Sequence, residues 1–386
     1  MEVVGERVSW ARARAIAAEA AKPLDRVVVD LGDALGTVLA APLTARLPQP
    51  CVAVSAMDGY AVAGPAPWRI VGPRLFAGDR PWERALLPGQ AAEIATGAPV
   101  PDGADAVLPV EHAHRDGNLL SGVLGAKPHI RQSGEDFAAG ELLVPESAVV
   151  TPAVLGLAAA LGCDTVDVHR RPRVRVALTG DELLRSGLPE PGRVRDAIGP
   201  MLPGLVDRFG GELVEMFYLP DRIDALGALF VDGDEDVLVV CGSTSVGTAD
   251  HLHTRLAAAR AQLYVDGVAC RPGHPQLLAG LPDGRFVLGL PGNPAAALVA
   301  ALTLLGPLLG ALGGRVLPRL ATVVLRDPPK PHHRDTLLKG VVADGDEVVL
   351  VGGDRPGNLL APARADALAI IPPNWIGPRV ELLPLH

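Results

Sequence analysis

The sequence predicts a multidomain protein that combines a parallel-sheet α/β domain with β-rich parts. The chain has 386 residues, of which 48% are hydrophobic and 20% charged. It is therefore long enough for two to four domains with sizeable cores. Between 173 and about 312, apolar strand-like runs alternate with helical ones, which indicates a sheet covered on both faces. Between 51 and about 139, short apolar runs are cut by Gly and Pro, which indicates a β-rich lobe.

The N-terminal region is predicted to begin with a helix over 9–22. Ser9 can cap this helix, Pro23 can stop it, and Trp10 with several Ala residues should face a core. Short strand-like runs are expected over 26–50, and one more helix over 152–162. The basic pair before Pro172 is a natural domain boundary.

The α/β pattern defines a domain over 172–313. From 316 onward short β runs return, which predicts a small C-terminal β-domain over 316–386, and three prolines within 328–331 indicate an irregular connector. The strands are expected at 174–179, 212–219, 236–241 and 285–290, the helices at 200–209, 221–231, 249–260 and 294–311, and C-terminal β runs at 345–352 and 366–371.

Composition limits the function. A net charge of −9 argues against general nucleic-acid binding, although a local basic pocket can still take a small anion. The four cysteines are far apart and include no Cys-x-x-Cys pair, so we expect buried thiols in a reducing cytoplasm rather than zinc or disulfides. The N-terminus lacks a signal region, and we expect no apolar run of about 18 residues that would span a membrane.

Three Gly-bearing junctions follow predicted strands at one edge of the sheet, where ligands of such sheets bind. A strand–turn–helix junction offers free backbone N–H groups and a positive helix end, which suit a phosphate. No P-loop and no Gly-x-Gly-x-x-Gly is present, which disfavours a P-loop NTPase or a dinucleotide dehydrogenase. The junctions are Thr179-Gly180-Asp181-Glu182, Cys241-Gly242-Ser243-Thr244-Ser245-Val246-Gly247 and Leu290-Pro291-Gly292-Asn293-Pro294.

Three carboxylates are predicted at the same edge: Glu182, Asp221 and Asp250. Converging carboxylates repel one another unless a cation joins them, and Mg²⁺ with phosphate ligands is held in this way. Either aspartate alone could instead be an ordinary helix N-cap. For the set as a whole, beside the Gly turns, we favour a metal site.

Cations for an anion are predicted in Cys270-Arg271-Pro272-Gly273-His274-Pro275, where Arg271 could hold an oxyanion bidentately. A plain surface turn is an equal alternative for this segment. The lobe contains further polar strings around Asp58, Thr96 and Asp136, which turn structure alone could explain. His332 and His333 are expected to be solvated.

The ordered set of strings resembles the molybdopterin molybdenumtransferase family of the MoeA and gephyrin E-domain type. The resemblance covers nearly the whole chain. In the lobe it rests on Ser55-Ala56-Met57-Asp58-Gly59-Tyr60-Ala61, Thr96-Gly97-Ala98-Pro99 and Gly134-Glu135-Asp136, and beyond the lobe on Thr179-Gly180-Asp181-Glu182-Leu183, Ser245-Val246-Gly247-Thr248-Ala249-Asp250 and Leu290-Pro291-Gly292-Asn293-Pro294.

The resemblance implies an elongated N-terminal part (1–50 and 140–171) with an inserted lobe (51–139), a molybdopterin-binding α/β domain and a C-terminal β-domain. It implies a homodimer whose active site lies between the α/β domain and the partner's lobe, and a molybdopterin adenylyltransferase as a candidate partner. The implied substrates are adenylylated molybdopterin and molybdate, with Mg²⁺ and release of AMP. The implied ligand-binding residues are Asp58, Thr96, Asp136, Gly180, Gly242, Ser243, Ser245, Gly247, Arg271, Pro291, Gly292, Asn293 and Arg334.

The chain departs from the family pattern at several polar positions. Gly267 and His274 stand where the family carries Lys, Gly357 stands where it carries Ser, and Ala197 interrupts an Asp-Ser-Asn string. A catalytically weakened molybdopterin-binding carrier or scaffold is therefore the alternative function. We also expect molybdate binding to weaken as His274 loses its proton, near about pH 6.5 if its pKa is unperturbed.

Overall fold

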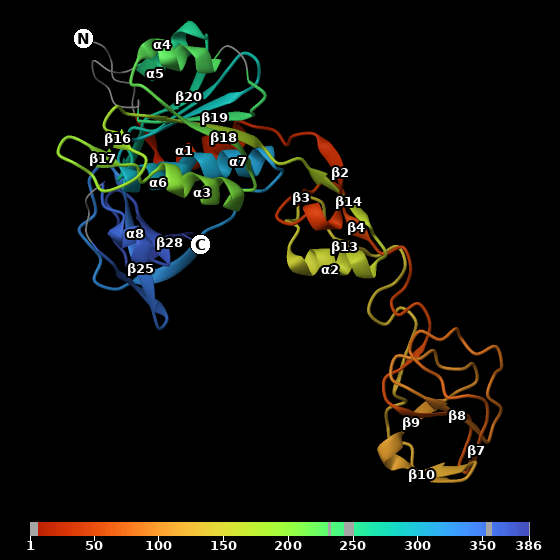
Figure 1. Cartoon of the computed structure of the whole chain (residues 1–386). Coiled ribbons are helices and arrows are strands. Elements are labelled where there is room, and N and C mark those ends of the chain that lie inside the picture. The colour runs from red at the N-terminus through yellow and green to blue at the C-terminus, as the bar shows by residue number, and fades with distance from the viewer. Residues whose placement is uncertain (1–6, 231–232, 243–250, 353–356, 386) are drawn as a thin grey trace. The chain divides into compact units, whose positions relative to one another are not determined.

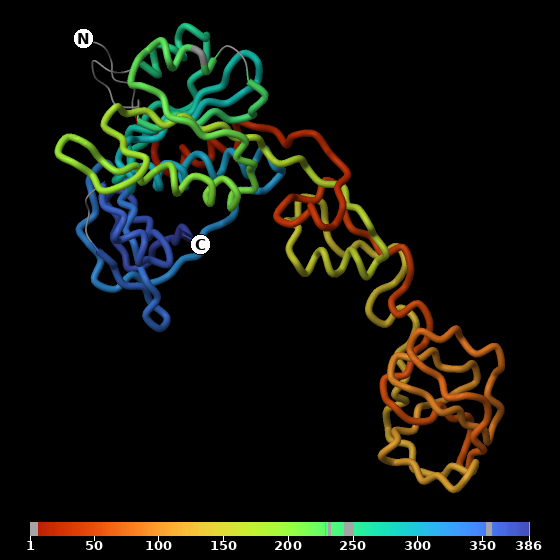
Figure 2. The backbone as a smooth tube through the Cα atoms, in the orientation of Figure 1, coloured from red at the N-terminus to blue at the C-terminus, as the bar shows by residue number. Residues whose placement is uncertain are grey.

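The computed structural model describes residues 7–230, 233–242, 251–352 and 357–385. The chain forms two compact units. The first comprises Met1–Ala41, Ser147–Leu155 and Thr165–His386, and the second comprises Pro42–Glu146 and Gly156–Asp164. Figure 2 traces the chain out of the first unit into the second and back again.

A six-stranded sheet forms the centre of the first unit (Figure 1). Its four predicted strands are confirmed as parallel neighbours. The sheet is nevertheless mixed, because β22 runs antiparallel to β20 and β23. Only residues 281–285 separate β22 from β23, too few for a parallel crossover. The strands, in spatial order, are β18 (Glu212–Leu219), β15 (Arg173–Thr179), β19 (Val237–Cys241), β23 (Phe286–Leu290), β22 (Leu277–Gly280) and β20 (Gln262–Asp266).

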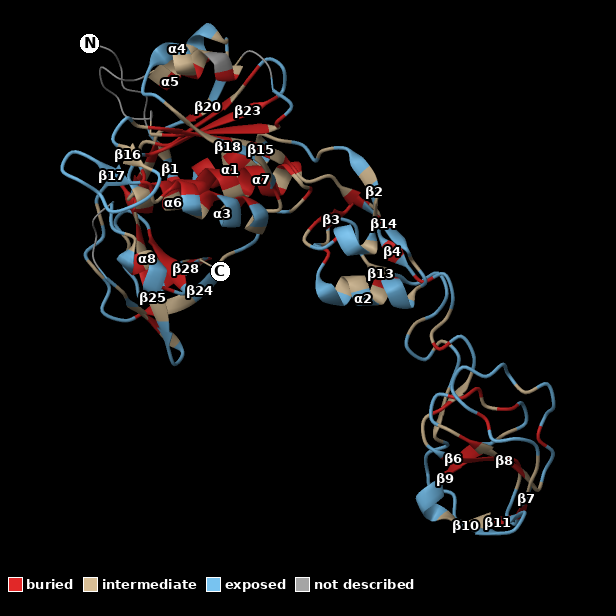
Figure 3. Cartoon of the chain, viewed as in Figure 1, coloured by how far each residue is buried: buried red, intermediate tan, exposed pale blue. Residues whose placement is uncertain are grey.

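Helices cover both faces of this sheet, and its central strands are buried (Figure 3). Alternate strand residues pack against different helices: Val239 joins the core formed with α1, α3, α6 and α7, whereas Val240 joins the core formed with α4 and α5. Because successive side chains of a strand point to opposite faces of the sheet, each central strand contributes to both cores. The first set is α1 (Trp10–Glu19), the 3₁₀ turn Gly199–Met201, α3 (Leu202–Arg208), α6 (Pro294–Ala300) and α7 (Gly306–Leu312), and the second is α4 (Ile223–Gly227), the 3₁₀ turn Ala228–Phe230 and α5 (His251–Ala258).

The segment Pro294–Leu312 is a continuous apolar helix of 19 residues with mean hydropathy 2.1. It consists of α6, a π-helical turn (Ala301–Leu305) and α7. Its length and composition would be sufficient for a membrane span. The expectation that the chain has no apolar run of about 18 residues is therefore wrong. Its apolar character has another explanation, because 78% of it is buried inside the first unit. A helix that is apolar all round is typical of a protein core.

Helix α1 is fixed to this central helix by polar contacts within the core. Ser9 caps α1 as predicted, accepting a hydrogen bond from the backbone N–H of Arg12. The Trp10 indole N–H donates to Oγ1 of Thr303 at 3.0 Å, and Thr303 in turn donates to the Val299 carbonyl. The buried Arg14 donates to the Leu302 carbonyl at 2.7 Å, and burial lowers its pKa to about 10. The carbonyl of Val299, just before the π turn, and that of Leu302, within it, thereby gain donors where α-helical bonding is interrupted.

The C-terminal β runs form a small closed barrel around its own core (Leu325, Val341, Val348, Ala369, Ile371). The ring closes because β25 pairs with both β26 and β27. One strand of the α/β domain, β21 (Val268–Arg271), also pairs with β25, and β1 (Val8–Ser9) pairs with β21. The barrel elements are β24 (Ala321–Leu325), β25 (Thr336–Asp344), β26 (Glu347–Leu350), β27 (Ala367–Ile371), β28 (Arg379–Pro384) and the outer helix α8 (Leu360–Arg364).

The second unit is β-rich, as predicted, around a six-stranded sheet of order β10-β11-β7-β8-β6-β9. Its elements are β4 (Leu43–Thr44), β5 (Val54–Ser55), β6 (Gly59–Val62), β7 (Trp68–Ile70), β8 (Gln90–Ile94), β9 (Ala106–Pro109), the 3₁₀ turn Val110–His112, β10 (Ala113–Asp116), β11 (Leu119–Gly122), β12 (Ile130–Arg131) and β13 (Leu142–Val144). The remaining elements of the chain are β2 (Arg26–Asp30), the 3₁₀ turn Leu31–Asp33, β3 (Val38–Leu39), α2 (Pro152–Ala160), β14 (Thr165–His169), β16 (Leu183–Leu184) and β17 (Val194–Arg195).

The cysteines differ from expectation in their burial. Cys241 and Cys270 are buried thiols, but Cys51 is exposed and Cys163 partly so. Burial raises the pKa of the Cys270 thiol to about 12. Cys51 precedes β5 (Val54–Ser55), and its thiol is exposed at the surface.

Replacing Thr303 with Val should destabilise the first unit. The variant keeps the shape of the side chain but leaves the Trp10 indole N–H without an acceptor in the core. We expect a loss of about 1–3 kcal/mol, measured as a lower denaturation midpoint in guanidinium chloride. Thr322→Val on the exposed face of β24 is the matched control and should change the midpoint little. Equal midpoints for the two variants would contradict the role given to the Trp10 contact.

Candidate functional site

The three Gly-bearing junctions meet at the carboxyl edge of the six-stranded sheet. Gly180 and Gly242 have φ of +137° and +111°, which few other residues adopt. A Cβ on Gly242 would lie 2.7 Å from Oγ1 of Thr179, so the backbones of two strand ends approach closely there. The Gly242 N–H donates to the Leu290 carbonyl at 3.0 Å, and a Cβ on Gly292 would lie 3.7 Å from the Gly242 Cα. The predicted convergence of the junctions is thus observed for their described residues.

Two of the three predicted carboxylates leave neighbouring strands at this edge. β15 and β18 pair up to Thr179 and Leu219, and Glu182 and Asp221 follow shortly after. The Glu182 carboxylate folds back over Gly180, where a Cβ would lie 2.8 Å from Oε2. Asp221 does not open the following helix, because α4 begins at Ile223.

A further carboxylate at this edge, Asp181, was missed by the sequence analysis. Its Oδ1 accepts from the Asp221 backbone N–H at 3.4 Å. Asp181 directly precedes Glu182, a predicted metal ligand, and this position in the sequence could have marked it as a candidate.

The third predicted carboxylate, Asp250, lies outside the described residues, as do Ser243, Ser245 and Gly247 of the Gly-rich turn. Carboxylate oxygens are the donors that Mg²⁺ prefers, so Glu182 and Asp221 fit that ion chemically. Within the described ranges, no group of three or more His, Cys, Asp or Glu side chains is placed to hold a metal. A complete magnesium site here would therefore need Asp250 or oxygen atoms of the substrate.

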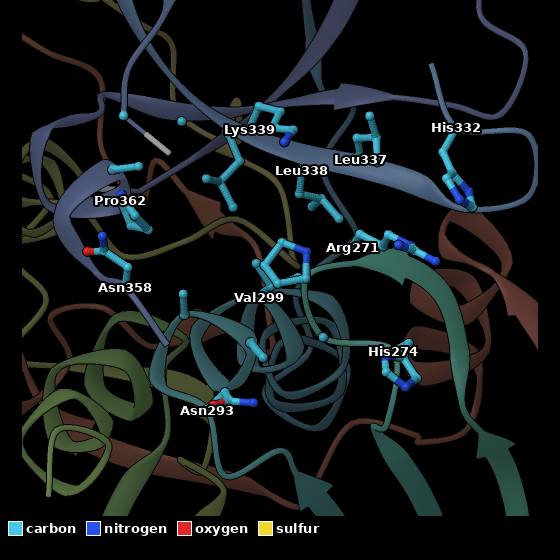
Figure 4. Close-up of a pocket in the computed structure, with 18 of the residues that line it drawn as sticks. Arg271, His274, Asn293, Val299, His332, Leu337, Leu338, Lys339, Asn358 and Pro362 are labelled. Atoms are coloured by element: carbon cyan, nitrogen blue, oxygen red, sulfur yellow. The ribbon is translucent and has the colours of Figure 1, made fainter. Parts of the chain in front are cut away.

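Beside this edge the first unit contains a cavity of about 870 Å³. Its floor comes from α6, through Ala295, Ala296 and Val299, and its walls come from the end of β21 and the turn after it, from β25 and from α8 with the preceding Asn358. In Figure 4, Arg271, His274 and His332 lie on one side of the pocket, Asn293 and Asn358 lie on the opposite side, and Lys339 lies on the barrel strand. The size is that of a pocket for a small organic ligand.

The cavity is positively charged although the chain is acidic overall. The described residues that line it include no Asp or Glu. Cationic or ionisable nitrogen groups come from the N-terminus, the α/β domain and the barrel: Arg7, Arg271, His274, Lys330, His332 and Lys339. A basic cavity on a protein of net charge −9 concentrates positive potential and favours an anionic ligand.

Arg271 is held in this wall by a buried carboxylate. Its Nε donates to Oδ2 of Asp335 at 2.7 Å, and Asp335 is 1% exposed. Burial alone would raise the pKa of Asp335, but the hydrogen bond from Arg271 and the charge of Arg7 outweigh it and keep the pKa below its ordinary value. The carboxylate is therefore ionised at neutral pH, and it fixes the orientation of the guanidinium.

His274 does not have the unperturbed pKa assumed above. Burial lowers its pKa, and the neighbouring charges of Arg7 and Arg271 lower it further, while Asp335 acts in the opposite sense. The imidazole is consequently neutral at pH 7 and offers a hydrogen-bonding nitrogen rather than a full charge.

The structure separates the predicted ligand-binding residues into groups. Arg271, His274, Pro291 and Asn293 line the cavity, whereas Arg334 is exposed and does not line it. Gly357 lies beside the cavity, since a Cβ there would be 3.7 Å from Oδ1 of Asn293. Oδ1 of Asp196, before Ala197, accepts from the backbone N–H groups of Ile198 and Gly199, and its Oδ2 accepts from the Tyr218 hydroxyl at 2.7 Å.

Several lining residues were missed or misjudged. His332 is half-buried in the wall rather than solvated, and its Nδ1 accepts from the backbone N–H groups of Arg334 and Asp335. Lys339 lies on β25, Asn358 precedes α8 and Lys330 lies in the connector before β25, and no functional motif marked any of them. The local sequence pointed to this wall of the cavity only through the Pro-rich connector and its lysine, Lys330.

The lobe residues form contacts within the second unit. Oδ1 of Asp58 accepts from the backbone N–H of Thr96 at 2.7 Å and from its hydroxyl at 3.0 Å, which lowers the pKa of Asp58. Asp136 is paired with Arg131. Asp58 and Thr96 thus form one polar pair, and Asp136 belongs to a separate, exposed ion pair.

The chain matches known proteins along most of its length. The family model described as MoeA N-terminal region (domain I and II) matches 8–162, and the one described as probable molybdopterin binding domain matches 175–311. The second model covers the six-stranded sheet, except for the first two residues of β15, and the three junctions. The α/β part of the chain is therefore of the molybdopterin-binding class.

Whole-chain relatives make the assignment more specific. A molybdopterin molybdenumtransferase from Nostoc sp. is 34% identical over 90% of this chain and 85% of the relative. Molybdopterin molybdenumtransferase 2 from Mycobacterium tuberculosis is 36% identical over 85% and 83%. A solved structure of the molybdopterin biosynthesis MoeA protein from Pyrococcus horikoshii is 27% identical with a TM-score of 0.78, covering 99% of this chain and 100% of that one.

The chain belongs to the molybdopterin molybdenumtransferase family. It is accordingly a transferase with a role in molybdenum cofactor biosynthesis.

The lowered pKa of His274 predicts a specific pH dependence of oxyanion binding. Only protonated His274 adds a charge, so molybdate affinity should rise as pH falls below the ordinary histidine value of about 6.5 and stay flat above it. His274→Lys should remove this dependence and strengthen binding at pH 7.5 roughly fivefold, as one nearby charge does. Equilibrium dialysis with molybdate at several pH values measures both effects. His114→Lys, in the second unit, is the charge-matched control, and an equal gain there would contradict the local role of His274.

Proposed function

We propose that this chain inserts molybdenum from molybdate into adenylylated molybdopterin, with Mg²⁺-dependent release of AMP. The observation that carries the proposal is the basic cavity beside the carboxylate-bearing edge of the sheet. Both substrates are anions. Molybdate needs cations and N–H donors, whereas Mg²⁺ needs carboxylates, and the chain supplies these two chemistries in neighbouring places.

The cationic residues of the cavity and the carboxylates of the sheet edge would bind different groups. Arg271 and Lys339 would attract and orient the oxyanion, and the Asn293 side chain, at the start of α6, would add a polar contact. Glu182 and Asp221, with Asp250 outside the described residues, would hold Mg²⁺. When bound, the ion would neutralise charge on the phosphoryl oxygens of the adenylylated substrate.

The protein is also proposed to act as a homodimer in which Asp58, Thr96 and Asp136 complete the partner's site. The family resemblance motivates this arrangement. The Asp58–Thr96 pair supports it chemically, because an ionised carboxylate fixed by two donors is a preformed polar contact for a ligand. A molybdopterin adenylyltransferase is the proposed supplier of the adenylylated substrate.

A molybdopterin-binding carrier without turnover is the second candidate. The observation in its favour is the weakened cation set, with Gly at 267 and a neutral imidazole at 274. The two functions differ in AMP release, which a carrier would not catalyse although it would bind the substrate.

Removing a carboxylate from the sheet edge should abolish turnover and spare binding. Glu182→Gln and Asp250→Ala should each lower Mg²⁺-dependent AMP release by roughly 100-fold or more, the scale of losing an electrostatic catalytic group. The assay mixes adenylylated molybdopterin, molybdate and Mg²⁺ and follows AMP by chromatography. Glu190→Gln, an exposed carboxylate of the following loop, is the matched control and should keep wild-type activity. Substrate binding without AMP release by the wild-type chain would instead identify a carrier.

Subunit mixing tests the shared site. An Asp58→Ala chain and a Glu182→Gln chain should each be inactive as homodimers. In a heterodimer one of the two sites contains neither substitution, so random exchange should restore up to about a quarter of wild-type activity, given the symmetry of a two-fold dimer. Activity that stays at background after exchange has been verified by mass spectrometry would contradict a site built from two subunits.

A further inference from the structure

Asp335 is a buried carboxylate that contacts two guanidinium groups. Oδ2 accepts from Arg271 Nε, whereas Oδ1 makes no hydrogen bond within the described part of the chain and lies 3.6 Å from Nη1 of Arg7. A desolvated carboxylate is stable only beside cations. The packing around Asp335 therefore holds Arg7 and Arg271 at the same wall of the cavity, which both residues line.

Strand pairing brings Arg7 to this wall from the beginning of the chain. Val8 pairs with Val268, and the Val8 N–H donates to the Gly267 carbonyl at 3.2 Å. Gly267 has φ of +80°, and a Cβ placed on it would lie 3.3 Å from Cγ of Arg7. The stem of Arg7 thus packs over the backbone of Gly267, where a longer side chain would displace it.

We propose that Arg7 is an oxyanion-binding residue of the cavity, positioned by Asp335, and that it provides a second fixed guanidinium beside Arg271. The ligand class is a tetrahedral oxyanion. The proposal rests on the proposed function, since it adds a residue to the same site.

Charge balance supports this role. Asp335 carries one negative charge and faces two guanidinium groups, so the pair retains one positive charge at the cavity wall. Nε of Arg271 is engaged by Asp335, but among the described residues its terminal nitrogens make no hydrogen bond. A guanidinium with free donors in a fixed orientation matches the geometry of an oxyanion.

The same contacts explain how the chain accommodates Gly at 267. A lysine introduced there would occupy a strained backbone conformation and compete with Arg7 for space. Arg7, the residue before β1, supplies a cation beside Gly267. A residue distant in the sequence thus takes the place of the lysine that is missing at 267.

Equilibrium dialysis of the full chain with molybdate alone tests the proposal. Arg7→Gln should weaken molybdate binding roughly tenfold or more, the scale of one charge-assisted contact, and Arg7→Lys should restore most of it. Arg12→Gln, on α1 and outside the cavity lining, is the matched control and should bind as wild type. Unchanged binding of both molybdate and AMP by Arg7→Gln, or no measurable binding of either anion by the wild-type chain, would overturn the proposal. Thermal unfolding of each variant verifies that it is folded.

A second arm uses AMP to identify which oxyanion Arg7 contacts. Weaker binding of molybdate alone assigns Arg7 to that dianion, whereas weaker binding of AMP alone assigns it to the phosphoryl end of the substrate, and either result supports an oxyanion-binding Arg7. Because neither arm measures turnover, they separate this inference from the proposed function. A chain that binds molybdate through Arg7 yet releases no AMP would refute only the latter.

The positioning role of Asp335 is tested by Asp335→Asn. Removing a negative charge should tighten oxyanion binding if only net charge mattered, whereas loss of the fixed guanidinium orientation should weaken it severalfold. In this background Arg7→Gln should cost less than it does in the wild type, because the two residues act together. Tighter binding by Asp335→Asn, or additive effects of the two substitutions, would overturn the positioning role.

Discussion

The architecture of the first unit depends on the burial of one apolar helix, Pro294–Leu312. This helix begins at the Asn293 junction, forms the floor of the cavity through Ala296 and Val299, and packs against the sheet. It also receives α1 through the Trp10–Thr303 bond. Its burial drives folding through the hydrophobic effect, and in doing so it brings the start of the chain, the carboxyl edge of the sheet and the barrel to a common place.

Electrostatic separation follows from this arrangement. Carboxylates gather at the ends of β15 and β18, and cations gather in the cavity, with Asn293 near the boundary between the two. Asp335, the acidic residue that contacts Arg7 and Arg271, is buried behind them and orients them instead of repelling the ligand. A chain of negative net charge can in this way offer a local positive surface to an anion and a negative one to a metal ion.

Local patterns in the sequence predicted the elements well and their long-range pairings poorly. The strands β15, β18, β19 and β23 and the Ser9 cap follow from apolar runs and capping chemistry, which act over a few residues. The pairing of β1 with β21 joins residues about 260 positions apart through a strand of two residues, too short for any periodicity. Arg7 could not be identified for that reason, and Lys339 is hidden in an ordinary barrel strand. Glu182 and Arg271 could be proposed from the sequence because they stand in recognisable turns.

The long apolar helix contributes to the core both before and after the π-helical turn Ala301–Leu305, through α6 and α7. Both α6 and α7 bury most of their residues. The π turn sets the rotation of α7 about the helix axis relative to α6, and this rotation would be different in a regular α-helix. Each residue of an α-helix advances the side chain by about 100°. Deleting one residue within the turn would rotate α7 by that angle, and Leu308 and Leu309 would lose their present packing partners in the core. The length of this turn is therefore constrained more tightly than its composition, and insertions or deletions in natural variants should avoid it.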